Sequence, residues 1–357
     1  MRYLITGAAG FLGAAVTRRV LAEGDEAVGL VRDAGAAKDL EAAGARIVTG
    51  TVGDPNDVAA AAHGCTVLVH CAAVPSHRAS RRALRWTNVA GTENVLKAAR
   101  KAGCERVVHV SCADVTLSNQ DRVHWNEKRE LDHRPLDEHA ITKQVAEDLV
   151  LSENGRGIEA TALRPALLWG PGDRTHLPAL AREGLAGGIR LVGSGESFIA
   201  TTYVESFVDA VLAAAEVTAA PGHAYLVADG ELAEAREFFE QLSGAVGLPP
   251  PRTGPTYGLA YAMAWARERM RNAGPWPTDV IHRGRSTHFD CQNAMTDLDW
   301  SPRPMTEGME RLAEWAKEVG GPAAVAAMYR PPAGAASVDS EVATAGGDVR
   351  PLARDRT

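Results

Sequence analysis

The stretch that decides the fold reads Arg2-Tyr3-Leu4-Ile5-Thr6-Gly7-Ala8-Ala9-Gly10-Phe11-Leu12-Gly13. An apolar strand ends at Gly7, and a helix opens at about Gly10 with apolar residues at helical spacing. The glycines allow a tight turn and let backbone N–H groups approach a pyrophosphate at the positive end of the helix. Gly13 lets the helix and the strand pack closely. The stretch therefore predicts a dinucleotide-binding turn, and a purely structural turn is the alternative.

Apolar runs alternate with helical patterns through the first half of the chain. The runs that predict strands are residues 3–6, 27–31, 46–48, 67–70, 107–110 and 160–163. Between the first two runs, Leu12, Val16 and Val20 recur at the helical period. Strands and helices that alternate at these lengths predict an α/β fold with a Rossmann-type, doubly wound parallel sheet.

The pattern loosens after Arg164-Pro165, where Gly170-Pro171-Gly172 and Gly193-Ser194-Gly195 break it into smaller elements. We expect residues 1–163 to form the nucleotide-binding domain and residues 164–330 to form mainly a smaller α/β substrate-binding domain. Residues 331–357 are rich in Ala, Gly, Pro, Ser and Asp and have no apolar periodicity. A disordered tail is predicted there.

The composition is that of an ordinary globular protein. Of 357 residues, 45% are hydrophobic, and the formal net charge of -7 gives no electrostatic footprint for nucleic acid. The five cysteines form no CxxC motif or His/Cys cluster with metal-ligand spacing, so no metal site is predicted. The N-terminus lacks a signal-peptide pattern, and the apolar residues 257–266 are too few to span a bilayer. We expect a cytoplasmic protein with reduced thiols and no membrane partner.

The end of the second predicted strand bears on the choice of cofactor. Sites that prefer NAD place a carboxylate there for the ribose 2′-hydroxyl, whereas an arginine accommodates a 2′-phosphate. Val31 occupies the expected acidic position, and Arg32 follows it. The sequence therefore favours NADP(H), while Asp33 keeps NAD open as the alternative.

Several stretches resemble the extended short-chain dehydrogenases/reductases of the NAD-dependent epimerase/dehydratase superfamily. The opening turn resembles their nucleotide loop, Gly53-Asp54 their adenine-contacting acidic turn, and His70-Cys71-Ala72-Ala73 the end of their fourth strand. Asn88-Val89-Ala90-Gly91-Thr92-Glu93-Asn94-Val95 matches their central helix, which carries a structural or proton-relay Asn. The cofactor contacts that the residues and the resemblance imply are Gly7, Ala9, Gly10, Phe11, Leu12, Gly13, Arg32, Asp54, Cys71, Ala72, Ala73, Asn88, Lys143, Pro165, Ala166, Leu167 and Leu168.

Within that superfamily the chain most resembles the 3β-hydroxysteroid dehydrogenase and dihydroflavonol reductase branch. Arg164-Pro165-Ala166-Leu167-Leu168-Trp169-Gly170-Pro171-Gly172-Asp173 is similar to the nicotinamide-side loop of that branch. Phe289-Asp290-Cys291-Gln292-Asn293-Ala294 is similar to its C-terminal signature. Sugar-nucleotide epimerases usually carry an Asn where this chain has Ala166. The resemblance therefore implies a reductase more than a sugar-nucleotide enzyme.

The catalytic positions of this family are matched only in part. In the family, a Ser or Thr polarises the substrate carbonyl, a Tyr transfers the proton, and a Lys four residues later holds the cofactor ribose. By this resemblance Cys112 takes the hydroxyl position with Ser111 beside it, Lys143 is in place, and His139 replaces the Tyr. Because a thiol is a weak hydrogen-bond donor, Cys112 is either a weak polarising group or a small space-filling residue.

Three mechanisms are compatible with the replacement of the Tyr. In the first, neutral His139 donates a proton to the developing alkoxide, since a position in the first helical turn near Lys143 disfavours the imidazolium. In the second, the substrate supplies its own proton, for example from a phenol beside the ketone. In the third, the site has lost its chemistry and only binds a dinucleotide.

These features predict an NADPH-dependent ketoreductase of a bulky apolar or aromatic ketone, polyketide-, flavonoid- or steroid-like, in a pathway such as antibiotic biosynthesis. The partner is then a small-molecule ketone, and a homodimer is an open option because family members often form dimers. Two rival functions remain: a non-catalytic NADP(H)-binding sensor or scaffold, and a nucleotide-sugar epimerase or dehydratase. The late aromatic residues either line a pocket for an oily substrate or form a small core; they are Trp169, Phe198, Tyr257, Tyr261 and Trp265.

Overall fold

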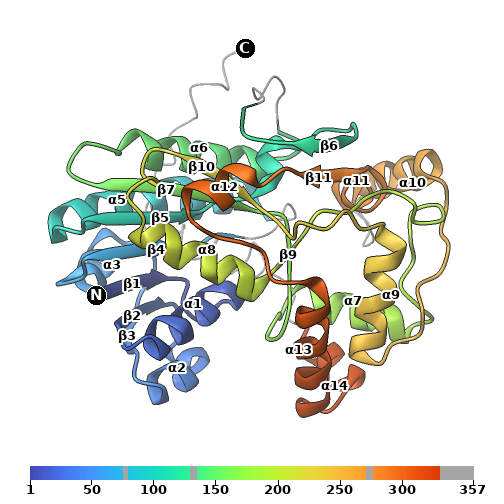
Figure 1. Ribbon diagram of the computed structural model, residues 1–357, viewed down its shortest axis with the longest axis horizontal. Coiled ribbons are helices and arrows are strands. Elements are labelled where there is room, and N and C mark those ends of the chain that lie inside the picture. Colours follow the sequence, from blue (N-terminus) through green and yellow to red (C-terminus); the bar gives the residue numbers. More distant parts are fainter. Residues whose placement is uncertain (75–78, 129–134, 271–275, 330–357) are drawn as a thin grey trace.

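The structure is a computed structural model of the chain and describes residues 1–74, 79–128, 135–270 and 276–329 (Figure 1). The disordered tail predicted over residues 331–357 lies outside the described residues. Within them, no helix is both long and apolar enough to cross a membrane.

A seven-stranded parallel sheet forms the centre of the first half of the chain. Its strand order is β10-β7-β5-β4-β1-β2-β3, and every neighbouring pair is parallel. The strands are β1 (Arg2–Thr6), β2 (Glu26–Val31), β3 (Arg46–Thr49), β4 (Val67–His70), β5 (Arg106–Val110), β7 (Glu159–Pro165) and β10 (Ala224–Val227). The six predicted strands and the doubly wound parallel fold are confirmed; β10 was not predicted. The order reverses between β1 and β4, which is where such sheets bind ligands.

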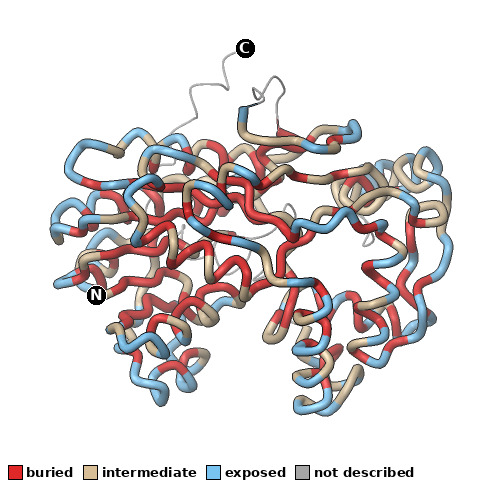
Figure 2. The backbone as a smooth tube through the Cα atoms, in the orientation of Figure 1, coloured by how far each residue is buried: buried red, intermediate tan, exposed pale blue. Residues whose placement is uncertain are grey.

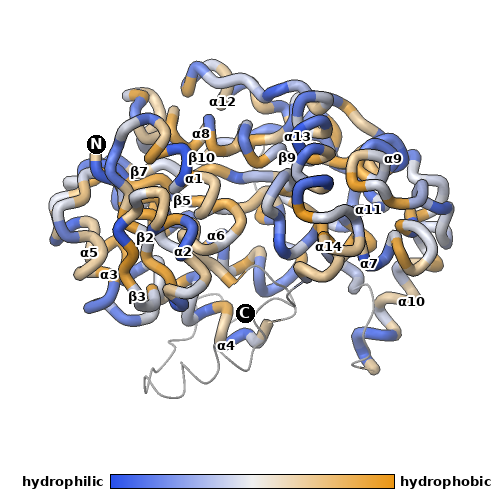
Figure 3. Tube along the Cα trace, turned by 90° about the horizontal axis from the view of Figure 1, so that it is seen from below, coloured by the Kyte–Doolittle hydropathy of each residue, from blue (hydrophilic) through white to orange (hydrophobic). Residues whose placement is uncertain are grey.

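Alternation along the strands sends apolar side chains to both faces of the sheet. On one face Tyr3 and Ile5 join a core with α1 (Phe11–Ala22) and α8 (Val204–Glu216). On the other face Leu4 joins a core with residues of three helices, α3 (Pro55–Ala62), α5 (Gly91–Ala102) and α6 (Glu138–Ser152). Figure 2 shows the buried backbone running through the centre of this layered arrangement, and Figure 3 shows hydrophobic segments both near strands such as β2 and β5 and on helices such as α9. A buried aliphatic side chain contributes roughly 1.5–3 kcal/mol, so both faces stabilise the sheet.

The chain after β7 builds smaller elements and then returns to the sheet. Two short parallel pairs form, β8 (Leu167–Trp169) with β9 (Thr201–Tyr203) and β6 (Arg122–Trp125) with β11 (Thr287–Phe289). The returning elements are α8 and β10, so residues beyond 163 also complete the sheet. The remaining elements are η1 (Ala34–Ala37), α2 (Lys38–Ala42), α4 (Arg81–Leu84), η2 (Arg85–Ala90), η3 (Ala113–Thr116), α7 (His176–Leu185), α9 (Ala235–Val246), α10 (Tyr257–Arg269), α11 (Pro277–Gly284), α12 (Gln292–Asp297), α13 (Met305–Glu318) and α14 (Pro322–Ala327).

A buried carboxylate joins the small β8–β9 pair to the end of β10. Asp229 accepts hydrogen bonds from Trp169 Nε1, Thr201 Oγ1 and the Tyr203 backbone N–H, each 2.8 Å long. The Trp169 ring also packs against Tyr203 and Phe238. Trp169 is therefore a core residue, which agrees with the small-core interpretation of this aromatic side chain.

Candidate active site

In the turn between β1 and α1, the neighbouring backbone lies too close to Gly7 and Gly13 for a side chain at either position. Gly7 adopts φ +68°, and a Cβ on it would lie 3.0 Å from the Ala72 backbone. A Cβ on Gly13 would lie 2.3 Å from the Gly7 carbonyl oxygen, so the helix can approach the strand only because this residue is glycine. Gly10 precedes α1, no side chain of a described residue caps that helix, and its first turn contains no acidic residue. The N–H groups at this helix end fit an anionic diphosphate.

The predicted cofactor-selecting residues follow β2. Arg32 is exposed, and Asp33 accepts a hydrogen bond from the Gly35 backbone N–H at 2.8 Å and thereby caps η1. The carboxylate of Asp33 is thus engaged by its own turn. Asp54 similarly caps α3 by accepting a 2.8 Å hydrogen bond from the Asn56 N–H.

The buried His70 at the end of β4 connects the end of β1 to α5. Thr6 Oγ1 accepts a hydrogen bond from the Ala72 N–H and lies 2.8 Å from His70 Nδ1. Thr92 Oγ1 donates to the Asn88 carbonyl oxygen and lies 2.9 Å from His70 Nε2. Thr92 therefore accepts from Nε2–H, and Thr6 donates to Nδ1, which makes the ring neutral. Burial and the nearby Lys143 lower the pKa of His70 to about 3, in agreement with this tautomer.

Asn88 lies in the π-helical segment η2 and bridges two parts of the site. Its Oδ1 accepts a hydrogen bond from the Val74 N–H at 2.8 Å, and its Nδ2 donates to Thr142 Oγ1 at 3.1 Å. Thr142 Oγ1 in turn donates to the His139 carbonyl oxygen at 2.9 Å. The amide predicted from the sequence therefore holds the loop after β4 and the first turn of α6 together. Short π-helical segments are common at functional sites.

The helix α6 carries the predicted His139 and Lys143. Asp137 caps it by accepting a 2.9 Å hydrogen bond from the Ala140 N–H. Lys143 is only 4% exposed, and its Nζ donates a 2.5 Å hydrogen bond to the Val110 carbonyl oxygen at the end of β5. Burial lowers the pKa of Lys143, so its ammonium gains from any negative group bound nearby.

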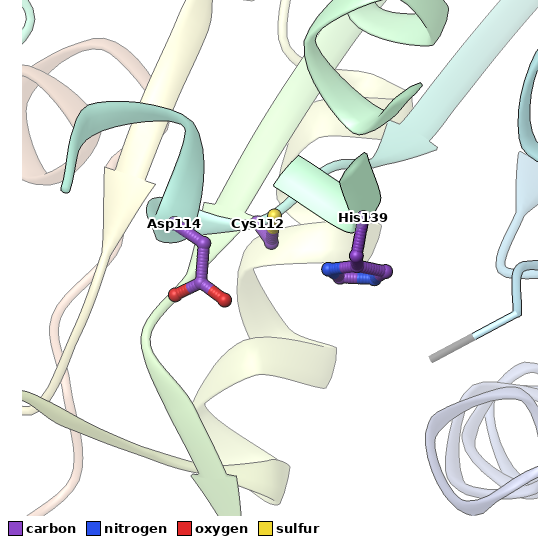
Figure 4. A group of neighbouring side chains, drawn as sticks. All are labelled: Cys112, Asp114 and His139. Atoms are coloured by element: carbon purple, nitrogen blue, oxygen red, sulfur yellow. The ribbon is translucent and has the colours of Figure 1, made fainter. Parts of the chain in front are cut away.

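Cys112, Asp114 and His139 form a compact group at the carboxyl end of β5, where Cys112 precedes η3 and Asp114 lies within it (Figure 4). One potential ligand atom from each of the three side chains lies within 4.8 Å of the other two. Burial, then the charge of Asp114, raises the pKa of the Cys112 thiol well above its ordinary value, so the thiol is neutral. Cys112 and His139 were predicted as catalytic positions from the family resemblance, but Asp114 was not predicted, and its only local signal is its place two residues after Cys112.

Two buried polar side chains beside this group have no hydrogen-bond partner among the described residues. They are Ser111, through its Oγ, and His109, through both ring nitrogens. The His109 ring lies 5.2 Å from the His70 ring, and burial and the charge of Lys143 lower the pKa of His109. Uncommitted polar groups in the interior are typical of sites that bind a ligand.

An ion pair fixes the end of β7 to α6. Arg164 donates hydrogen bonds of 2.9 Å and 2.5 Å to the two carboxylate oxygens of Glu147, and both side chains are buried. Beyond it, Ala166 donates its N–H to Thr202 Oγ1 at 2.9 Å. The predicted nicotinamide-side residues Ala166, Leu167 and Leu168 are half-buried, whereas Pro165 is buried. The pairing of Arg164 with Glu147 was not predicted, because no local sequence pattern pairs a strand end with a helix face.

Comparison with protein families decides the identity at the level of family. The family model described as "NAD dependent epimerase/dehydratase family" matches residues 3–228, which include the turn, Lys143 and the group around Cys112. The chain belongs to that family. The predicted membership of this superfamily is thereby confirmed.

Curated relatives cover most of the chain. The 2-alkyl-3-oxoalkanoate reductase of Stenotrophomonas maltophilia is 31% identical over 87% of this chain and 98% of its own length. The 4-hydroxy-2-methyl-3-oxo-4-farnesyl-3,4-dihydroquinoline-1-oxide ketoreductase of Stigmatella aurantiaca is 35% identical over 70% of this chain and 74% of its own. The 3-beta-hydroxysteroid dehydrogenase of Mycolicibacterium neoaurum is 30% identical over 86% of this chain and 88% of its own length. The relatives are thus ketoreductases and steroid dehydrogenases, as the predicted branch implies.

A solved structure with the same fold is MoeE5 in complex with UDP-glucose and NAD. It has a TM-score of 0.71 and 24% sequence identity, and the match covers 89% of this chain and 99% of MoeE5. At this identity the likeness concerns the fold alone.

Proposed function

We propose that the chain is an NADPH-dependent ketoreductase for a ketone with a long apolar or polycyclic aromatic body. The observation that carries the proposal is the placement of Lys143, Cys112 and His139 at the carboxyl end of β5, on the same sheet edge as the glycine turn. Ligands of open α/β sheets bind at this edge. Two relatives are named as reductases of an alkyl-oxoalkanoate and of a farnesylated quinoline ketone, which supports the substrate class.

The cofactor would be held by residues of the turn and of the strand ends. The glycine turn would bind the diphosphate, Arg32 the 2′-phosphate, and Lys143 the nicotinamide ribose. Arg32 is exposed, and Asp33 already caps its own turn, so this strand end suits NADPH better than NADH. Bound NADPH supplies the hydride for the carbonyl carbon.

The substrate oxygen would lie between Cys112 and His139. The neutral Cys112 thiol can donate a weak hydrogen bond to that oxygen, and His139, which occupies the place of the family's Tyr, would donate a stronger one and then a proton. A carboxylate oxygen of Asp114 lies within 4.8 Å of a His139 ring nitrogen, so its negative charge would stabilise a protonated ring. A hydroxyl of the substrate itself is the second source of the proton.

Residues 164–330 would mainly cover the substrate, and residues 1–163 would hold the nucleotide. Ala166, which follows β7, and Leu167 and Leu168, which begin β8, are half-buried, and an apolar substrate body could cover them. This division also fits a role in the tailoring of secondary metabolites, because such substrates are bulky and largely apolar.

The proposal is tested by measuring nucleotide binding and turnover on the full chain. NADPH binding is followed by nucleotide fluorescence, and NADPH oxidation is measured with 2-alkyl-3-oxoalkanoates and polycyclic aromatic ketones. We expect oxidation with at least one of these ketones. Tight binding without turnover of any ketone would establish the sensor or scaffold instead. Conversion of a nucleotide sugar without net change of the cofactor would establish the epimerase.

A further inference from the structure

Two segments far apart in the sequence bring together a thiol, a carboxylate and an imidazole. Cys112 and Asp114 follow β5, and His139 lies in the first turn of α6, yet their potential ligand atoms lie within 4.8 Å of one another (Figure 4). Thiolate sulfur, imidazole nitrogen and carboxylate oxygen are the donors that zinc prefers in proteins. The sequence predicted no metal site, because the spacing of these residues gives no metal-ligand motif.

A thiolate and a carboxylate in this group can together supply two negative charges to one bound ion, because the ligand atoms of Cys112 and Asp114 lie within 4.8 Å of each other. A divalent ion bound to one thiolate and one carboxylate would leave this group of side chains without net charge.

A second histidine supports the carboxylate from outside the group. Nε2 of His282, on α11, lies 3.4 Å from Asp114 Oδ1. This nitrogen is inaccessible to solvent and makes no hydrogen bond within the described part of the chain. A small tightening of the contact would let His282 hold one carboxylate oxygen while the other binds a metal. Ligating carboxylates are commonly held in this way by an outer partner.

We propose that Cys112, Asp114 and His139 bind a zinc ion with His282 as the outer partner of Asp114. The Cys112 thiol loses its proton to solvent when it binds the ion. Three protein ligands leave a fourth position open, as in catalytic zinc sites, and this position would take the carbonyl oxygen of the ketone. The ion then does the work of the missing Tyr by polarising the carbonyl, His139 is a ligand instead of the proton donor, and the alcohol takes its proton from solvent.

The binding half of this proposal is independent of the proposed function, and only the catalytic half rests on it. Zinc binding is therefore measured without nucleotide or ketone, on full-length protein carrying no histidine tag. Competition with a chromophoric chelator gives the affinity and stoichiometry, and substitution with Co²⁺ gives a thiolate-to-metal absorption band if Cys112 is a ligand. We expect one ion per chain and such a band.

Variants assign the ligands. We expect Cys112→Ser, Asp114→Asn and His139→Phe each to weaken zinc binding by more than 100-fold, and Cys112→Ser to abolish the Co²⁺ band. His282→Phe removes only the outer partner and should weaken binding roughly 10–100-fold. Cys71→Ser changes a thiol beside Lys143 but outside the group, so it should bind zinc normally. Circular dichroism establishes that each variant is folded.

Two outcomes would overturn the proposal: folded wild type that binds no zinc at micromolar concentration, or zinc that is retained in all three ligand variants. Ketone reduction that is insensitive to chelators would remove the catalytic half alone. Zinc binding without any ketone reduction would leave the metal site intact and contradict the proposed function.

Discussion

The nucleotide turn and the group around Cys112 are built in opposite ways. The turn depends on backbone conformation within one stretch of sequence, where Gly7 and Gly13 leave no space for side chains. The group around Cys112 depends on side chains that come from two distant segments. Local sequence therefore identifies the first region almost completely, whereas the second becomes visible only when the chain is folded. Four substitutions or conditions can break or sharpen this contrast.

The largest loss of stability is expected when the ion pair between Arg164 and Glu147 is broken. This pair fixes α6, the helix that carries His139 and Lys143. Arg164→Met leaves the buried Glu147 carboxylate without its partner and should lower the free energy of unfolding by about 3–5 kcal/mol. Urea unfolding of both proteins at neutral pH measures this change in the free energy of unfolding. Arg311→Met, which breaks an exposed pair with Glu314, is the control and should cost about 0–1 kcal/mol. Equal losses in both variants would contradict the role given to the buried pair.

Acid should lower the free energy of unfolding through the buried His70, which forms a hydrogen bond with Thr6, next to the nucleotide turn. The folded pKa of about 3 is far below the ordinary 6.5, so only the unfolded chain takes up the proton between these values. Stability due to neutral His70 is therefore present above pH 6.5 and is lost as the pH falls towards 3. The slope approaches roughly 1.4 kcal/mol per pH unit.

Unfolding in urea at pH 7, 6, 5 and 4 measures the dependence on His70. His70→Asn should reduce the slope between pH 6 and pH 4, whereas the exposed His63→Asn controls for the loss of a histidine. An unchanged slope in His70→Asn would show that another group causes the acid sensitivity.

A single methyl group added at Gly13 should destabilise the turn between β1 and α1. Gly13→Ala places a Cβ against the Gly7 carbonyl oxygen, which is backbone and cannot rotate away. We expect a loss of about 1–3 kcal/mol in stability and weaker NADPH binding. Gly244→Ala in α9 is the matched control, because outside its own helix backbone no described residue has an atom within 4 Å of its Cβ position. Alanine favours a helix by up to about 1 kcal/mol over glycine, so the control should be neutral or stabilised.

The smallest expected effect is on the preference for NADPH over NADH. If Arg32 recognises the 2′-phosphate, Arg32→Ala should weaken NADPH binding about tenfold, which is the loss of roughly 1.4 kcal/mol, and leave NADH binding unchanged. Titration of both nucleotides by fluorescence measures the ratio. Equal weakening of the two would show that Arg32 does not distinguish them.

The sequence was sufficient for features that depend on neighbouring residues. The fourth strand was predicted at residues 67–70 and is found as Val67–His70, and α1 begins at Phe11, directly after the predicted Gly10. Lys143 was identified by its resemblance to the family's lysine, and the helical spacing predicted only that it shares a face with His139.

Other features were not readable from local pattern. The strand β10 has only four residues and lies in a stretch with weak periodicity. It is therefore recognised by its hydrogen-bonded pairing with β7 and not by its own sequence. The links of Asp114 to His139 and of Arg164 to Glu147 join separate elements. Such contacts follow from the packing of α6 on the sheet, which sequence spacing does not encode.

The π-helical segment Arg85–Ala90 has an evolutionary consequence. A π turn holds one residue more than an α turn, and each residue advances a helix by about 100°. We expect the deletion of one codon between Arg85 and Asn88 to rotate the preceding residues of the helix by about 100° relative to the Asn88 amide, which contacts Val74 and Thr142. One insertion or deletion is thus enough to couple or uncouple the two halves of the site in a descendant of this chain.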